Sequence, residues 1–151
     1  MIRSLKLPCA AFFVALIAAV PTAFAHVSVR PAEAPLGAET AYTVRVPTEG
    51  ESTTTSVQLD IPENVVVLSV NGGAGTFEMK KTGDRVTAIV WKTSIPAGQR
   101  AELTFTARNP ASGNEISWKA HQFFADGTRA DWIEAKGSKR PESITALKVA
   151  Q

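Results

Sequence analysis

The sequence predicts an all-β protein, a single β-sandwich of about eight or nine short antiparallel strands. Two observations lead to this prediction. Stretches of alternating apolar and polar residues recur at roughly 8–12-residue spacing, separated by Gly, Pro, Asn and Asp turn residues. From residue 26 onward, no window of about 11 residues holds a helical apolar period free of Pro or Gly. No internal repeat or low-complexity segment divides the chain, so residues 26–151 are expected to form one domain.

Residues 1–25 have the features of a cleaved secretory signal peptide. Arg3 and Lys6 form a positively charged N-terminal region, and an uncharged apolar run follows from Ala10 to Val20. Ala23-x-Ala25 supplies the small residues that signal peptidase accepts. The apolar run is about half the length that spans a bilayer. We therefore expect cleavage after Ala25 and a periplasmic product.

Cleavage after Ala25 would make His26 the first residue of the mature protein. The α-amine and the imidazole Nδ1 of a first-position histidine can close a chelate ring on one metal ion, whereas the amide nitrogen of the uncut chain cannot. A histidine also occurs at this position by chance in a few per cent of exported proteins. The other potential metal-binding residues of the sequence therefore decide how strongly a metal-binding role of His26 is favoured.

The first half of the mature chain contains several predicted strands. They are 26–30, ending at Pro31; a strand over Tyr42, Val44 and Val46, ending at Pro47; and one over Val57, Leu59 and Ile61. Residues 31–37 are predicted to be a connection and residues 48–55 a polar loop. Residues 65–68 are apolar without alternation, which predicts a strand that is buried on both faces or bent.

The second half continues the same pattern. Strands over 77–81 and 85–92 flank Thr82-Gly83-Asp84, the spacing of a tight hairpin. Residues 100–107 alternate most clearly, with Leu103 and Phe105 on one face and Glu102 on the other. Further strands are predicted over 115–124, 128–134 and 144–149, with a polar loop over 136–142. Trp91 and Trp118 are predicted to lie in the core.

Composition excludes several classes of function. Without Arg3 and Lys6, the mature chain has 14 basic and 14 acidic residues, and it has no basic block. This argues against nucleic-acid binding and against an electrostatic membrane anchor. The mature chain has no cysteine, one methionine and two histidines. Blue-copper, methionine-rich cuprous and three-histidine zinc sites are therefore excluded.

A metal held by His26 would need further donors. Glu102 could supply a carboxylate oxygen, although a strand glutamate is ordinarily a solvated partner of an arginine or lysine. Three other acidic residues could serve as well, and the residues alone leave the choice open: Glu33, Glu39 and Glu134. Trp132 is either a core residue or a shield beside the ion. His121 is the only other imidazole, so it is the only candidate for a second one.

Catalytic motifs are absent from the sequence. It contains no Gly-x-Ser-x-Gly turn, and Gly72-Gly73-Ala74-Gly75 lacks the lysine of a phosphate-binding loop. We therefore expect a binding protein rather than an enzyme.

Several motifs together resemble the YcnI-like copper-binding proteins, over nearly the whole mature chain. They are His26-Val27-Ser28-Val29-Arg30-Pro31-Ala32-Glu33, Tyr42-Thr43-Val44-Arg45-Val46-Pro47, Pro96-Ala97-Gly98-Gln99 before Glu102-Leu103-Thr104-Phe105, and Gln122 to Gly127 before Trp132. The resemblance implies an immunoglobulin-like or cupredoxin-like sandwich that binds Cu(II) through a single-histidine brace. It implies that His26 provides its amine and imidazole, Glu102 a carboxylate, and Trp132 a neighbour of the ion. His121 would be a weaker contact.

The function expected from this resemblance is that of a periplasmic Cu(II) carrier in copper acquisition or homeostasis, without a membrane anchor in the mature chain. Its partners would be the copper ion and a membrane copper transporter or another periplasmic copper protein. Two alternatives remain. One is a metal-free adhesion or assembly module. The other is an oxidative, polysaccharide-cleaving copper enzyme, for which His121 would have to be the second imidazole of the brace.

Overall fold

The computed structural model describes residues 26–151, and the predicted signal peptide lies outside the described residues. The described chain contains only strands and connections. The strands are β1 (Ser28–Arg30), β2 (Glu33–Pro35), β3 (Glu39–Pro47), β4 (Thr54–Asp60), β5 (Val66–Asn71), β6 (Thr76–Thr82), β7 (Arg85–Ile95), β8 (Arg100–Arg108), β9 (Glu115–Trp118), β10 (Ala120–Phe124), β11 (Arg129–Trp132) and β12 (Ser143–Lys148). Among residues 26–151, no helix is long and apolar enough to cross a membrane.

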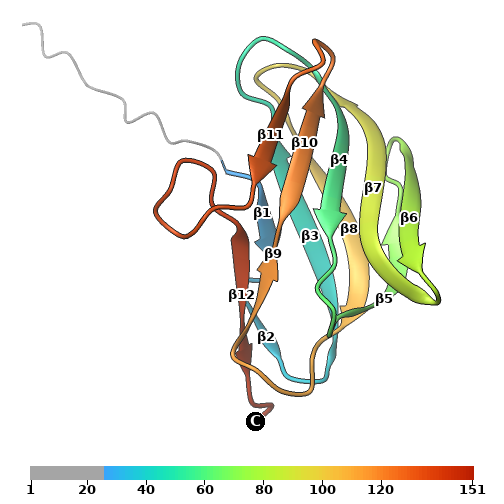
Figure 1. The fold of residues 1–151 in the computed structure, drawn as a ribbon, viewed down its shortest axis with the longest axis vertical. Helices are drawn as coiled ribbons and strands as arrows, with labels where there is room; N and C mark the ends of the chain where they lie inside the picture. The colour runs from blue at the N-terminus through green and yellow to red at the C-terminus, as the bar shows by residue number, and fades with distance from the viewer. Residues whose placement is uncertain (1–25) are drawn as a thin grey trace, which may run out of the picture.

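Two larger sheets form the sandwich, as Figure 1 shows. One has the strand order β1-β3-β8-β5, and the other has the order β11-β10-β4-β7-β6. A third sheet, β2-β12-β9, closes one side, with β2 and β12 parallel. The predicted all-β sandwich is thus confirmed.

The core lies between the two larger sheets and is filled by the apolar face of each alternating strand. Tyr42 and Phe105 stack with ring centroids 5.3 Å apart, and Trp118 packs edge-on against both rings. Trp91 and Trp118 are fully buried, as predicted. Each indole N–H has an acceptor: Asn71 O for Trp91 and Thr145 Oγ1 for Trp118, both at 3.0 Å. Burial of these large rings therefore leaves no indole donor unpaired.

The structure differs from the predicted elements in three places, and it has twelve strands rather than eight or nine. Residues 33–35, predicted to be part of a connection, pair with β12 as β2. The predicted strand 115–124 divides at Lys119, because β9 pairs with β12 whereas β10 pairs with β4. The apolar and polar residues alternate in the same way whether or not a stretch moves from one sheet to another, so the sequence does not reveal this change.

The apolar stretch 65–68 is bent but is not buried on both faces. Residues 66–68 form the first half of β5, an edge strand with an irregular register between Val67 and Ser69. Val66 and Leu68 are exposed, whereas Val65 and Val67 pack toward the core. The sequence lacks alternation here because apolar residues also occupy the two exposed positions.

Candidate metal site at the start of β1

His26 lies immediately before β1, at the edge of the first sheet. The next residue, Val27, is almost completely buried, and Val29 is buried two positions later. β1 pairs with β3 with Ser28 opposite Arg45, so continuing this register sets His26 beside Pro47. Burial of Val27 and this pairing hold the backbone at His26 in place, although its own side chain is exposed.

Trp132 of β11 lies next to His26. The two ring centroids are 5.7 Å apart, and the ring planes are inclined by 57°. Trp132 is only 8% exposed and belongs to the core, so one indole serves both the core and the surroundings of His26. The structure therefore places together two of the residues singled out in the sequence.

A cavity of about 260 Å³ opens beside these two rings. It is lined by His26, Pro47, Glu49, Gln122, Phe124, Ala130, Trp132, Lys139 and Arg140. The walls come from both sheets: β3 and the residues after it on one side, β10 and β11 on the other. Glu49 is the carboxylate among these residues, and the imidazole of His26 is the other metal-binding side chain.

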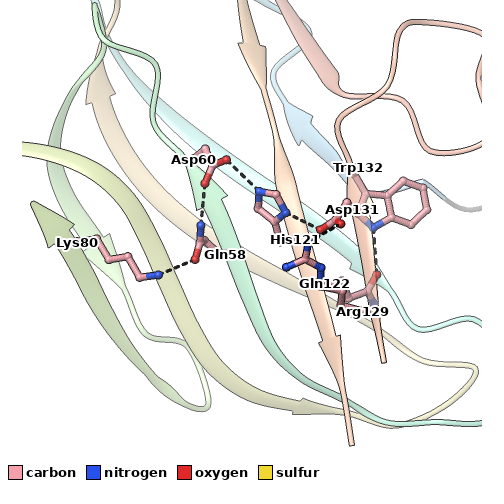
Figure 2. A network of polar contacts seen from close by, with 8 residues as sticks. All are labelled: Gln58, Asp60, Lys80, His121, Gln122, Arg129, Asp131 and Trp132. Atoms are coloured by element: carbon pink, nitrogen blue, oxygen red, sulfur yellow. Dashed lines mark hydrogen bonds and ion pairs between the residues drawn. The ribbon is translucent and has the colours of Figure 1, made fainter. Parts of the chain in front are cut away.

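Gln122 fixes the inner wall of the cavity. This side chain is 1% exposed. Its Nε2 donates to Pro47 O at 2.9 Å and to Thr54 Oγ1 at 2.7 Å. Its Oε1 accepts a hydrogen bond from Trp132 Nε1 at 3.3 Å, which Figure 2 shows. A single buried amide thus orients the Trp132 ring and joins the end of β3 to β10.

The connection from β11 to β12, residues 133–142, forms the outer wall; we call it the β11–β12 loop. Figure 1 shows it beside the start of β1. Glu134 N donates to Arg140 O at 3.1 Å, and Arg140 N donates to Glu134 Oε2 at 3.0 Å. This reciprocal pair closes the loop. A second, more open hollow of about 490 Å³ is lined by His26, Gly137, Ser138 and Lys139.

The structure places Glu102 elsewhere. Glu102 lies on β8, and its Oε1 accepts from Arg45 Nε at 3.1 Å. Its side chain is 57% exposed, and it is not among the residues that line the cavity. In the sheet Glu102 stands opposite Arg45, which in turn stands opposite Ser28. It therefore belongs to the outward face of the first sheet, two strands away from β1.

The other three acidic candidates also have partners of their own. Glu33 pairs with Lys148 at 3.5 Å, and Glu39 pairs with Arg108 at 2.8 Å. Glu134 accepts the backbone N–H of Arg140 within the β11–β12 loop. None of the three is among the cavity-lining residues.

His121 lies on the opposite face of the second sheet from the cavity. In β10 it alternates with Ala120 and Gln122, which face inward. Both of its ring nitrogens are engaged: Nδ1 with Asp131 Oδ1 at 2.6 Å and Nε2 with Asp60 Oδ2 at 2.9 Å (Figure 2). Burial acts to lower the pKa of His121, but hydrogen bonds to Asp131 and Asp60 outweigh it, so the pKa is raised. The two carboxylates therefore favour the protonated form of His121.

The same contacts act on Asp131. Its hydrogen bond with His121, together with the charge of Arg129 at 3.0 Å, lowers the pKa of the Asp131 carboxyl. Asp60 also accepts from Gln58 Nε2 at 2.8 Å, and Gln58 Oε1 accepts from Lys80 Nζ at 2.9 Å. This network ties β11, β10, β4 and β6 together across the outer face of the sheet.

Reasoning from the sequence missed Glu49, Lys139 and Arg140. All three lie in stretches predicted to be polar loops. The available signal for Glu49 was its place two residues after Pro47, where a predicted strand ends. That signal becomes specific only when β3 is known to pair with β1, which brings the end of β3 beside His26.

Two comparisons with known proteins show which family this chain belongs to. A family model described as a domain of unknown function (DUF1775) matches residues 74–147. The chain is 33% identical over 147 residues to the copper-binding protein CutI of Bacillus subtilis (strain 168), covering 95% of this chain and 72% of that protein. This chain belongs to the YcnI-like family. The family resemblance predicted from the sequence motifs is therefore confirmed.

Solved structures agree with the fold of this YcnI-like protein. An uncharacterized protein from Nocardia farcinica with an immunoglobulin-like fold superposes with a TM-score of 0.70 at 24% identity, covering 81% of this chain and 97% of that one. A non-cellulosomal cohesin from Archaeoglobus fulgidus gives a TM-score of 0.50 at 13% identity, covering 82% and 90%. The immunoglobulin-like sandwich is thereby confirmed, and similarity at this level of identity concerns the fold alone.

Proposed function

We propose that this protein is an exported Cu(II) carrier that holds the ion at a mature N-terminus beginning with His26. The observation that supports this most is that His26, Trp132 and Glu49 line one cavity. The copper-binding name of the relative from Bacillus subtilis supports the choice of metal. In the proposed site the α-amine and imidazole of His26 supply two nitrogens, and Glu49 supplies the carboxylate that we had expected from Glu102.

The donor set suits Cu(II). Among residues 26–151, no group of three or more His, Cys, Asp or Glu side chains is placed to hold a metal. A site at His26 therefore depends on a backbone donor, and a free α-amine would be one. Nitrogen and oxygen ligands in a tetragonal arrangement favour Cu(II) over other divalent ions, whereas the near absence of sulfur donors disfavours Cu(I).

The proposed role is transport of the ion rather than catalysis. His121, the second imidazole that an oxidative enzyme would require, is held by two carboxylates on the other face of the sheet. In the periplasm the carrier would receive or deliver Cu(II) at a membrane copper transporter or another copper protein. Reduction of the bound ion to Cu(I) by an external one-electron donor would favour release, because the proposed site, within residues 26–151, offers no sulfur ligand.

The test begins with two versions of residues 26–151, one with His26 free and one with an extra N-terminal residue. Each is titrated with Cu(II) and examined by electron paramagnetic resonance. We expect the free version to take one equivalent with nitrogen hyperfine structure and the extended version to lose that site. Equal binding by both versions would overturn the proposed brace.

Two matched substitutions then identify the carboxylate. Glu49→Gln and Glu102→Gln each replace one oxygen by nitrogen at constant size. We expect Glu49→Gln to weaken Cu(II) binding by about 100-fold or more, because loss of a direct ligand should exceed the roughly 10–100-fold cost of losing an outer partner. Glu102→Gln should leave binding unchanged. The reverse result would restore Glu102 as the ligand.

A further inference from the structure

Two cations line the cavity in which the proposed site would hold a divalent cation. Lys139 and Arg140 both belong to its lining, and Lys139 also lines the second hollow beside His26. The lining also includes one carboxylate, that of Glu49. A bound Cu(II) would therefore share its surroundings with two positive side chains.

In the part of the chain that the structure describes, several surface cations have a carboxylate partner, whereas Lys139 and Arg140 do not. Arg45, Arg108, Arg129 and Lys148 each pair with a carboxylate. For Lys139 and Arg140, no ion pair is formed within residues 26–151. Their backbone is nevertheless ordered, because Glu134 and Arg140 close the β11–β12 loop reciprocally. Two cations on a loop held by these hydrogen bonds thus remain available to an anion in the cavity.

We propose that the cavity takes Cu(II) together with one small carboxylate anion, which binds the metal and is paired by Lys139 and Arg140. This inference rests on the proposed function. His26 and Glu49 supply three donors at most, whereas tetragonal Cu(II) takes four in its plane. An anionic fourth donor would complete the plane and separate the metal from the two cations.

The size and chemistry of the cavity agree with this occupant. Its volume of about 260 Å³ is several times the roughly 30 Å³ that one water molecule occupies in the liquid. The planar guanidinium of Arg140 matches a carboxylate, which it can bind through two parallel hydrogen bonds, and the ammonium of Lys139 adds a point charge.

The experiment uses residues 26–151 with His26 free, in a buffer without coordinating anions, and acetate as the probe. The Cu(II)-loaded protein is titrated with acetate while the copper d–d absorption band is followed, and paramagnetic resonance with ¹³C-carboxyl acetate detects direct coordination. The same titration is made on Lys139→Gln/Arg140→Gln. The control is Lys136→Gln/Arg85→Gln, which removes equal charge from residues outside the cavity lining.

We expect saturable binding of acetate with ¹³C coupling in the wild type and in the control. The Lys139→Gln/Arg140→Gln variant should bind acetate about tenfold more weakly, because each exposed charge pair contributes about two- to fivefold to an equilibrium constant. Without acetate the same variant should bind Cu(II) more tightly than the wild type, because the two cations no longer repel the ion. If the two cations had only a structural role, their replacement would not weaken acetate binding and at the same time strengthen Cu(II) binding.

Two results would overturn the inference. In one, copper binds with nitrogen hyperfine structure but its spectrum is indifferent to acetate. In the other, acetate binds equally well to the wild type and to Lys139→Gln/Arg140→Gln. Failure of the proposed function would look different, because the nitrogen hyperfine structure would then be missing before any acetate is added.

Discussion

Replacing Gln122 by Met should test whether one buried amide holds both the sandwich and the cavity wall. Methionine has nearly the shape of glutamine but cannot make its three hydrogen bonds. The substitution would remove the acceptor of Trp132 Nε1 and the donor to Pro47 O. Thr54 Oγ1 would keep a partner, because it also lies 2.7 Å from Thr48 Oγ1.

The expected cost follows from the two groups that lose their partner. Leaving a buried donor or acceptor unsatisfied costs about 1–3 kcal/mol each, so Gln122→Met should lower the free energy of unfolding by about 2–6 kcal/mol. For a domain of this size, 1 kcal/mol corresponds to a change in Tm of about 4 °C. A fall in Tm of about 8–24 °C is therefore expected.

Urea unfolding followed by tryptophan fluorescence would measure this cost. The matched control is Gln58→Met, in the neighbouring strand β4 but on the outward face, where Gln58 contacts Asp60 and Lys80. Because Asp60 and Lys80 can form hydrogen bonds with water instead, Gln58→Met should lower the free energy of unfolding by less than about 1 kcal/mol. Equal stability of Gln122→Met and the wild type would refute the idea that this amide is structurally required.

Three further substitutions test other parts of the structure. His121→Gln should remove stability that is fully present below about pH 6.5 and is lost as pH rises through the raised pKa of His121. The stability that Asp131 gains from its lowered pKa is present above about pH 3.8 and is lost in acid. In urea unfolding at a series of pH values, the wild type and His121→Gln should therefore differ most between about pH 3.8 and pH 6.5. Gly75→Ala should destabilise strongly, because a Cβ there would lie 1.9 Å from Lys92 O; circular dichroism melting that shows no loss would contradict this. Tyr42→Phe should cost about 1–2 kcal/mol in urea unfolding, because the buried 2.6 Å hydrogen bond to Asn109 is lost, and an unchanged midpoint would argue against that bond.

The fold could be predicted from the sequence because each strand leaves a local signal. Tyr42, Val44 and Val46 alternate with polar residues, and the structure buries all three in one layer. The interruption at Lys119 could not be predicted, because it depends on which sheet each half of the stretch joins. Likewise, the short strand β2 exists through its pairing with β12, more than 100 residues away in the chain.

The candidate site was predicted only where its chemistry is local. His26 and Trp132, which the structure places side by side, were both singled out from the sequence, His26 because its proposed role depends on its own position and Trp132 because the family motif contains it. Glu102 was chosen for its place in a motif, yet in the structure it pairs with Arg45 across two strands. Glu49 was missed because its relation to His26 depends on the pairing of β1 with β3, which no pattern within either strand specifies.

The location of the proposed site would allow a chain terminus at His26 to bind a metal. Ordering a free terminus costs about 1–2 kcal/mol for each residue whose backbone must be fixed. At His26 most of that cost has been met by folding, because Val27 is buried and β1 is paired with β3. Gln122 likewise fixes Trp132 in the facing sheet before any metal arrives. The sandwich would thus supply a preorganised site although its nitrogen donors lie at the end of the chain.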